Sequence, residues 1–304
     1  ALFFDPTIHT DSDKIGPVPV PVPLLTCTGA VVRYGSPTLN SFSVPMLLRS
    51  TSLLSRTALR RGAGAAASSR CMSSSDRPEP QQVDSLLQIG SRRIYDETHD
   101  MYRETVRNFY NEKLVPFHEE WENKGECPRE LWQDAGANGM LAVTVPEEYG
   151  GMGLDILFSS INWQEQSYAG TTGPGWALHS EIVAPYLVNY GTEEQKQEWL
   201  PQMVSGDAIT AIAMTEPGAG SDLQGMRTTA VKDGDDYIIN GSKTFITNGW
   251  LSDMVIVCAK TDPTKGAKGI SLFVVDTKTE GFKKGKKLKK MGMKAQETAE
   301  LFFE

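Results

Sequence analysis

The chain has 304 residues, of which 22% are charged, and its formal net charge at pH 7 is −8. This length is enough for about two domains, and the acidic balance argues against a nucleic-acid partner. No stretch reaches the roughly 18 consecutive apolar residues that a transmembrane helix requires. The four cysteines are scattered without a CxxC pair, which is typical of reduced thiols and indicates neither a disulfide framework nor a metal site.

The N-terminal region changes character at Met46. Residues 1–45 lack periodicity and contain VPVPVP, so we expect them to be disordered or to lie upstream of the natural start. Residues 46–81 are rich in Arg and Ser, and no acidic residue occurs before Asp76. This composition is typical of a mitochondrial transit peptide with a linker, and it predicts import into the mitochondrial matrix. The alternative is a tail with no targeting role.

Residues 82–206 show helical periodicity, which predicts an N-terminal helical domain. Pro116 predicts a stop or kink within it. Thr192 with Gln195 predicts a capping box at the start of a later helix. We expect His179 to be a helix-surface or packing residue and not a metal ligand, because the four histidines are scattered.

Residues 207–304 carry short β runs separated by Gly, Asp, Asn and Pro, a pattern typical of a barrel or sandwich. Asn240 and Gly241 lie between two such runs and predict a tight hairpin turn, because both central residues of a type I′ turn need positive φ. We expect the Lys-rich residues 283–290 to form a solvated loop beside a strand.

The most informative motif is AMTEPGAGSD at residues 213–222. Its glycines leave backbone N–H groups open to a flat ring or a phosphate, and Thr215 and Ser221 add hydroxyls. Downstream, Phe245 and Thr247 are two residues apart in a predicted strand, so their side chains share a face. The alternatives are an ordinary Gly/Pro loop and a core aromatic residue beside an incidental threonine.

Together with GTEEQKQEWLP (191–201), INGSKTFITNG (239–249) and MGMKAQETAELFFE (291–304), these motifs resemble the acyl-CoA dehydrogenase family. The resemblance covers residues 83–304. It implies an α+β fold in which the helical domain is followed by a β-barrel-like middle domain with a flavin face. It also implies FAD-dependent α,β-dehydrogenation of long-chain fatty acyl-CoA thioesters in mitochondrial β-oxidation. In that reaction a carboxylate removes the α-proton and flavin N5 takes the β-hydride.

The resemblance assigns roles to individual residues. Thr215 matches a flavin hydrogen-bond donor, and Thr247 matches the hydroxyl at N5. Phe245 matches a stacked aromatic that is Trp in several relatives, so it keeps the stacking surface and loses an N–H. The implied cofactor-binding set is Ile212, Ala213, Met214, Thr215, Gly220, Ser221, Phe245, Ile246 and Thr247. The implied substrate-binding set is Ser221, Ala267 and Lys268, and the Lys-rich stretch offers an alternative anchor for coenzyme A phosphates.

The catalytic base of the family is a Glu on a C-terminal helical domain, and no residue through Glu304 matches it. We therefore expect this chain to lack both that bundle and the base, and to be inactive alone. Glu216 matches a structural position in relatives.

The resemblance implies fatty acyl-CoA as substrate and electron-transfer flavoprotein as electron acceptor. It also implies a homo-oligomer, although the C-terminal domain supplies most of the subunit contacts. Two alternatives are a non-catalytic flavin- or thioester-binding protein derived from the family and an acyl-CoA oxidase, which uses the same fold with oxygen as acceptor.

Overall fold

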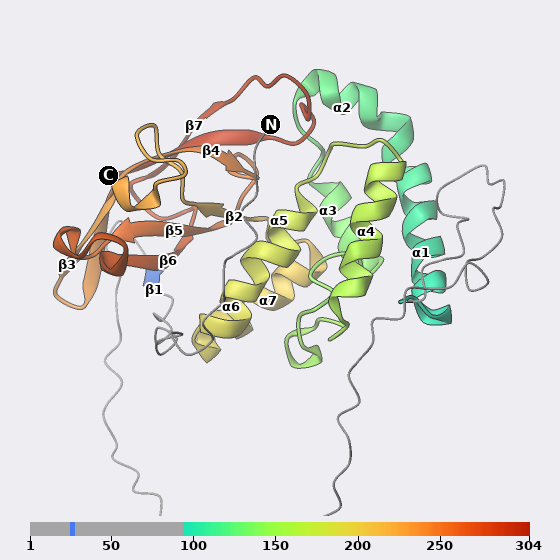
Figure 1. Cartoon of the computed structure of the whole chain (residues 1–304), viewed down its shortest axis with the longest axis horizontal. Helices are drawn as coiled ribbons and strands as arrows, with labels where there is room; N and C mark the ends of the chain where they lie inside the picture. Colours follow the sequence, from blue (N-terminus) through green and yellow to red (C-terminus); the bar gives the residue numbers. More distant parts are fainter. Residues whose placement is uncertain (1–24, 28–93) are drawn as a thin grey trace, which may run out of the picture. The chain divides into compact units, whose positions relative to one another are not determined.

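The computed structural model describes residues 94–304 and, for the backbone alone, a short strand at residues 25–27 (Figure 1). The predictions for the rest of residues 1–45 and for the transit-like residues 46–81 lie outside this described part. So does the start of the span 82–206, for which a helical domain is predicted.

The helices occupy the first part of the described chain (Figure 1). They are α1 Glu97–Phe109, α2 His118–Lys124, α3 Glu130–Ala137, α4 Ile156–Tyr168, α5 Trp176–Leu178, α6 Ala184–Tyr190 and α7 Glu193–Ser205. A π turn at Tyr110–Leu114 and a 3-10 turn at Val115–Phe117 separate α1 from α2, as Pro116 predicts. None of the described helices combines the length and the apolar character needed to cross a membrane.

The start of α7 has the predicted capping box. The Thr192 hydroxyl accepts a hydrogen bond from Gln195 N at 3.3 Å, and the Gln195 side chain accepts one from Thr192 N at 3.0 Å. Two backbone N–H groups that no helical turn can satisfy are thereby paired.

The strands belong to one sheet with the order β1-β6-β5-β3-β4-β8-β7, and β2 pairs with β5. They are β1 Leu25–Cys27, β2 Thr210–Ala213, β3 Thr229–Asp233, β4 Asp236–Thr247, β5 Met254–Lys260, β6 Ile270–Asp276, β7 Phe282–Lys287 and β8 Thr298–Phe303. Four of the described pairings are antiparallel, and three are parallel: β1 with β6, β2 with β5, and β3 with β5. A helical part followed by a curled, half-barrel sheet confirms the predicted α+β class and domain order.

The tight turn predicted at Asn240 and Gly241 is wrong. The chain reverses between β3 and β4 at Gly234, where φ is +62°, and β4 continues without interruption through the Asn-Gly pair. Asn240 is the last residue of β4 to pair with β3, and Gly241 is the first to pair with β8. Glycine is needed at this crossing because a Cβ there would lie 2.4 Å from the Thr228 Oγ1 atom.

The solvated loop expected at residues 283–290 is wrong in part, because β7 pairs with β8 at the end of the sheet order. Lysine and glycine are depleted in strands generally, so the composition of this segment favours a loop. Lysines are nevertheless typical of edge strands, where their charge discourages pairing with another chain. The Lys284 ammonium donates to Trp250 O at 2.9 Å and to Ser252 O at 2.7 Å. This use within the fold argues against Lys284 as an anchor for coenzyme A phosphates.

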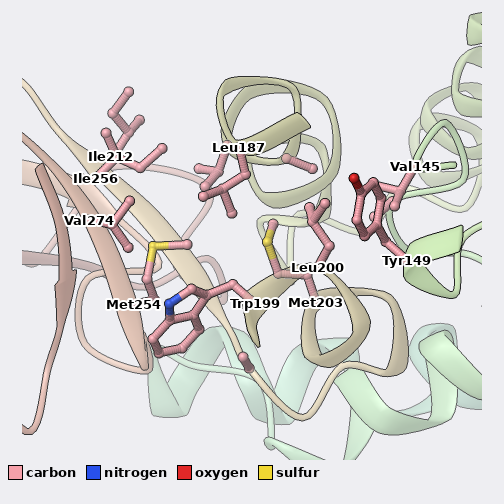
Figure 2. Packing of buried hydrophobic residues seen from close by; sticks show 14 residues of the cluster. Val145, Tyr149, Leu187, Trp199, Leu200, Met203, Ile212, Met254, Ile256 and Val274 are labelled. Carbon is pink, nitrogen blue, oxygen red and sulfur yellow. The ribbon is translucent and has the colours of Figure 1, made fainter. Parts of the chain in front are cut away.

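The helices and the sheet share one hydrophobic cluster (Figure 2). The labelled helical contributors are Leu187 on α6 and Trp199, Leu200 and Met203 on α7, and the labelled strand contributors are Ile212, Met254, Ile256 and Val274. Each fully buried aliphatic side chain contributes about 1.5–3 kcal/mol. Because Ile212 of β2 belongs to this cluster, packing fixes the position of the strand end from which the motif loop begins.

Candidate functional site

The structure brings the two motifs of the predicted flavin face together. This face consists of residues 212–221, at the end of β2 and in the loop after it, and residues 245–247, at the end of β4. Thr244 N donates to Thr215 O at 2.9 Å, and the Lys243 ammonium donates to Met214 O at 3.0 Å. Segments that are distant in sequence therefore lie side by side.

Phe245 is the most exposed residue of the strand end, at 67%, whereas its neighbour Ile246 is buried at 2%. Its φ is +60°, which is uncommon for a non-glycine residue and strained for a bulky one. The pairing of β4 with β8 shifts register between Lys243 and Ile246, and Lys243 and Thr244 are both buried. This bulge breaks the alternation of the strand and turns the Phe245 ring outward.

The other predicted cofactor contacts differ in exposure. Ile212, Ala213 and Ile246 are buried, Met214, Thr215 and Thr247 are half-buried, and Gly220 and Ser221 are exposed. A Cβ added at Gly218 or Gly220 would meet nothing within 4 Å, so the loop backbone is open to an approaching group. The outward phenyl ring, the accessible hydroxyls and the open backbone fit a flat heteroaromatic ring with a phosphate-bearing tail.

A buried ion pair joins the motif loop to β4. The Lys243 ammonium lies 2.9 Å from Glu216 Oε1, and the two side chains are 0% and 6% exposed. Glu216 also accepts hydrogen bonds from Arg227 N at 2.5 Å and Thr228 N at 3.0 Å. Burial alone would raise the pKa of Glu216, but hydrogen bonds from Thr228, Arg227 and Lys243 lower it to about 2.

Glu216 is thus ionised and fully engaged, in line with the structural role expected for it. Sequence reasoning did not find Lys243. The available signal was a lysine in the β-rich run that carries Phe245 and Thr247, downstream of a glutamate-bearing loop, and such a signal is weak on its own.

The predicted substrate residues lie in two exposed segments, the end of the motif loop and a segment that follows β5. Ser221 is exposed, and so are Ala267 and Lys268, which belong to a 3-10 segment, Pro263–Gly269. This segment packs beside the turn Leu223–Gly225, which follows the motif directly. The structure therefore brings the segment that carries Ala267 and Lys268 beside the turn that follows Ser221.

A cavity of about 400 Å³ opens beside Thr247. Its lining comes from α4, from the segment that leads into α5 and from the loop before β8: Trp163, Gln166, Ser167, Gly170, Thr171, Thr172, Pro174, Gly175, Ala177, Met293 and Gln296. A Cβ on Gly175 would lie 3.0 Å from Thr247 Cγ2, so the cavity wall touches the flavin face. Asn248, which sequence reasoning missed, donates to Gly175 O at 3.0 Å and fixes this contact.

The other buried ionisable groups near these segments are also engaged. Glu297 accepts hydrogen bonds from Trp250 N at 3.0 Å and Leu251 N at 3.2 Å, and burial raises its pKa to about 7. The His179 ring contacts Thr210 Oγ1 at 2.8 Å, and burial lowers its pKa to about 4. His179 is therefore a packing residue, as predicted. No cluster of three metal-ligating side chains occurs within residues 94–304.

Two sequence models define the class of the protein. The N-terminal domain of acyl-CoA dehydrogenase matches residues 96–207, and its middle domain matches residues 211–304. The chain belongs to the acyl-CoA dehydrogenase family, whose members are FAD-dependent oxidoreductases.

Among individual relatives, the chain is 54% identical over 263 residues to the long-chain specific acyl-CoA dehydrogenase, mitochondrial, of Rattus norvegicus. The aligned region covers 85% of this chain and 60% of that protein. An acyl-CoA dehydrogenase structure from Geobacillus kaustophilus is 51% identical with a TM-score of 0.68 and covers 70% of this chain and 56% of that one. A glutaryl-CoA dehydrogenase from Mycobacterium smegmatis in complex with FADH2 is 33% identical with a TM-score of 0.64, over 71% and 54% of the two chains. This chain thus spans little more than half the length of these relatives.

Proposed function

We propose that this chain provides the flavin face of an enzyme that dehydrogenates long-chain fatty acyl-CoA thioesters between Cα and Cβ. The observation that carries the proposal is the outward Phe245 ring, held at positive φ on a strand end that also carries Thr247 and is hydrogen-bonded to Thr215. The long-chain substrate class rests on the 54% identity to a long-chain specific relative.

FAD, when bound, supplies the acceptor for the β-hydride. On this chain, Phe245 would stack on the flavin ring, and the Thr247 hydroxyl would hydrogen-bond near N5. Backbone groups of residues 212–215 and the Thr215 hydroxyl would hold the pyrimidine edge. Ser221 would contact both cofactor and substrate, and Ala267 with Lys268 would contact the coenzyme A portion. The cavity beside Thr247 would take part of the acyl chain and exclude water from it.

Removal of the α-proton requires a positioned carboxylate, which typically contributes 10²–10⁴-fold to the rate. The two buried glutamates of the sheet region do not provide one. Glu216 is bound by Lys243 and two backbone N–H groups, and Glu297 is bound by two others. We therefore propose that the 304-residue chain binds FAD at this face but does not turn over acyl-CoA by itself.

The test titrates FAD into the full chain and follows flavin fluorescence and the visible spectrum. It then adds palmitoyl-CoA with an artificial electron acceptor. We expect saturable FAD binding, and no turnover above the protein-free control. Phe245→Ala should weaken FAD binding by removing the stacking surface, whereas Tyr190→Ala, which removes another exposed aromatic ring on α6, should leave it unchanged. Failure of the full chain to bind FAD would refute the proposed face, and robust turnover would refute the absence of a base.

We also propose that the protein acts in the mitochondrial matrix and passes electrons to electron-transfer flavoprotein. The Rattus norvegicus relative is a mitochondrial enzyme, and residues 46–75 have the acid-free, Arg- and Ser-rich composition of a transit peptide. Residues 46–80 fused to a fluorescent protein should co-localise with a matrix marker. A fusion with the five arginines of residues 46–75 changed to glutamine is the matched control and should stay cytosolic. Cytosolic signal from the unmodified fusion would refute the targeting proposal.

A further inference from the structure

The buried ion pair Lys243–Glu216 lies next to the residues that form the proposed flavin face. Lys243 is two residues before Phe245 on β4, and Glu216 directly follows Thr215 in the motif loop. The Lys243 ammonium donates to both the Glu216 carboxylate at 2.9 Å and the Met214 carbonyl at 3.0 Å. One cation therefore ties β4 to the two motif residues on either side of Thr215.

Glu216 extends this tie to a third segment. Its two carboxylate oxygens accept hydrogen bonds from the backbone N–H groups of Arg227 and Thr228, just before β3 begins. Burial opposes the charge on this carboxylate, but its hydrogen bonds lower its pKa to about 2, so it stays ionised at neutral pH. The end of β2, the start of β3 and the irregular part of β4 are thus joined at one point.

The same point is where β4 loses its regular register. The pairing with β8 shifts between Lys243 and Ile246, and Phe245 takes its positive φ within that shift. A one-residue slip of a strand moves each side chain to the opposite face. Here such a slip would carry the Lys243 ammonium away from Glu216 and leave an uncompensated charge in the interior, which is strongly unfavourable.

We infer that Lys243 and Glu216 are positioning residues for the flavin, because together they set the register of β4 that presents the Phe245 ring beside Thr215 and Thr247. This inference rests on the proposed function of the face. A buried ion pair adds little stability compared with well-packed apolar side chains, so its presence here is better explained by the geometry that it enforces.

The test compares the full chain with Lys243→Met, Glu216→Gln and the double variant that carries both changes. The control is Lys113→Met, which removes an exposed ion pair with Asp134 of the same 2.9 Å length. Three quantities are measured: the thermal midpoint, the affinity for FAD, and hydrogen exchange of peptides spanning residues 212–218 and 243–248 without FAD. The Thr244 amide, which donates to Thr215 O, reports the register directly.

Each single variant should lower the thermal midpoint, because it leaves one charged partner buried alone. The double variant should regain most of that midpoint, since no uncompensated charge remains. It should nevertheless bind FAD at least tenfold more weakly than the unmodified chain and exchange the Thr244 amide faster. Lys113→Met should change none of the three quantities.

Wild-type FAD affinity and wild-type exchange in the double variant would overturn the inference, because the pair would then serve stability alone. An unmodified chain that binds no FAD would overturn the proposed function, and the positioning role with it. Wild-type binding combined with an unaffected double variant would overturn the positioning role only, so the two failures can be told apart.

Discussion

The two halves of β4 follow different rules. Residues 236–240 pair with β3 in unbroken register after a turn at Gly234. Residues 241–247 pair with β8 through a register shift, bury the charge of Lys243 and hold Phe245 at positive φ. The register shift and the positive φ, which the first half lacks, therefore occur in the half that carries the proposed flavin contacts.

The largest expected difference between the halves concerns the buried ion pair of the second half. Lys243→Met should lower the free energy of unfolding by about 3–5 kcal/mol, because it leaves Glu216 buried without its cationic partner. Lys232→Met, at an exposed position that pairs with the first half of β4, should change it by less than about 0.5 kcal/mol. Denaturant unfolding measures both, and equal losses would contradict the distinction.

The second difference is a pH dependence set by Glu297, whose backbone carbonyl accepts from Asn248 N directly after β4. Burial raises the pKa of Glu297 to about 7, above its value in the unfolded chain. Its stabilising contribution is therefore complete below about pH 4.3 and is lost as the pH rises through 7.

Relative to Glu297→Gln, the wild-type chain should accordingly lose roughly 2–3 kcal/mol of stability between pH 5 and 8. Unfolding curves of both proteins at several pH values check the sign. A stability difference between the two proteins that stays constant over this range would contradict the raised pKa of Glu297.

The third difference concerns two glycines: Gly234, in the turn before the first half, and Gly241, the first residue of the second half. Gly241→Ala places a Cβ 2.4 Å from Thr228 Oγ1 and 2.8 Å from its Cα, so the backbone must move. It should cost roughly 1–3 kcal/mol from overpacking in addition to backbone strain. Gly234→Ala meets no atom within 4 Å and should cost only the strain of positive φ, about 1–2 kcal/mol. Thermal unfolding of the two variants measures which substitution destabilises the chain more. A larger destabilisation by Gly234→Ala would contradict the steric role assigned to Gly241.

The smallest expected effect is local to the flavin face. Thr247→Val removes one hydroxyl and should weaken FAD binding by about 0.5–1.5 kcal/mol, the net contribution of an ordinary hydrogen bond, while unfolding stays unchanged. Thr229→Val, on the β3 partner of the regular half, should not alter FAD affinity. Equal affinities for FAD in the wild-type chain and Thr247→Val would remove the hydroxyl of Thr247 from the set of flavin contacts.

Features that depend on neighbouring residues could be predicted from the sequence, whereas features that depend on contacts between distant segments could not. The capping box at Thr192 and the break at Pro116 depend on neighbouring residues and are present as predicted. The Asn-Gly pair fails as a turn signal because the glycine is required by a close approach of the backbone to Thr228, which is distant in sequence. The sequence does not predict β7, because its lysines and glycine favour a loop, whereas pairing with β8 holds them in a strand.

The candidate site divides in the same way. Its motifs predicted which segments would matter, and the structure places those segments side by side. The Lys243–Glu216 pair, the bulge before Phe245 and the cavity wall at Gly175 each depend on contacts between distant segments, so no single window of sequence contains them.

The hydrophobic cluster shared by α6, α7, β2, β5 and β6 has a consequence for cooperativity. The two family models meet between residues 207 and 211, yet side chains from both sides of that boundary fill a single core, and residues 97–304 belong to one compact unit. Separating the chain there would expose Leu200 and Met203 on one fragment and Ile256 on the other. We therefore expect the parts on either side of this boundary to unfold together in a single cooperative transition.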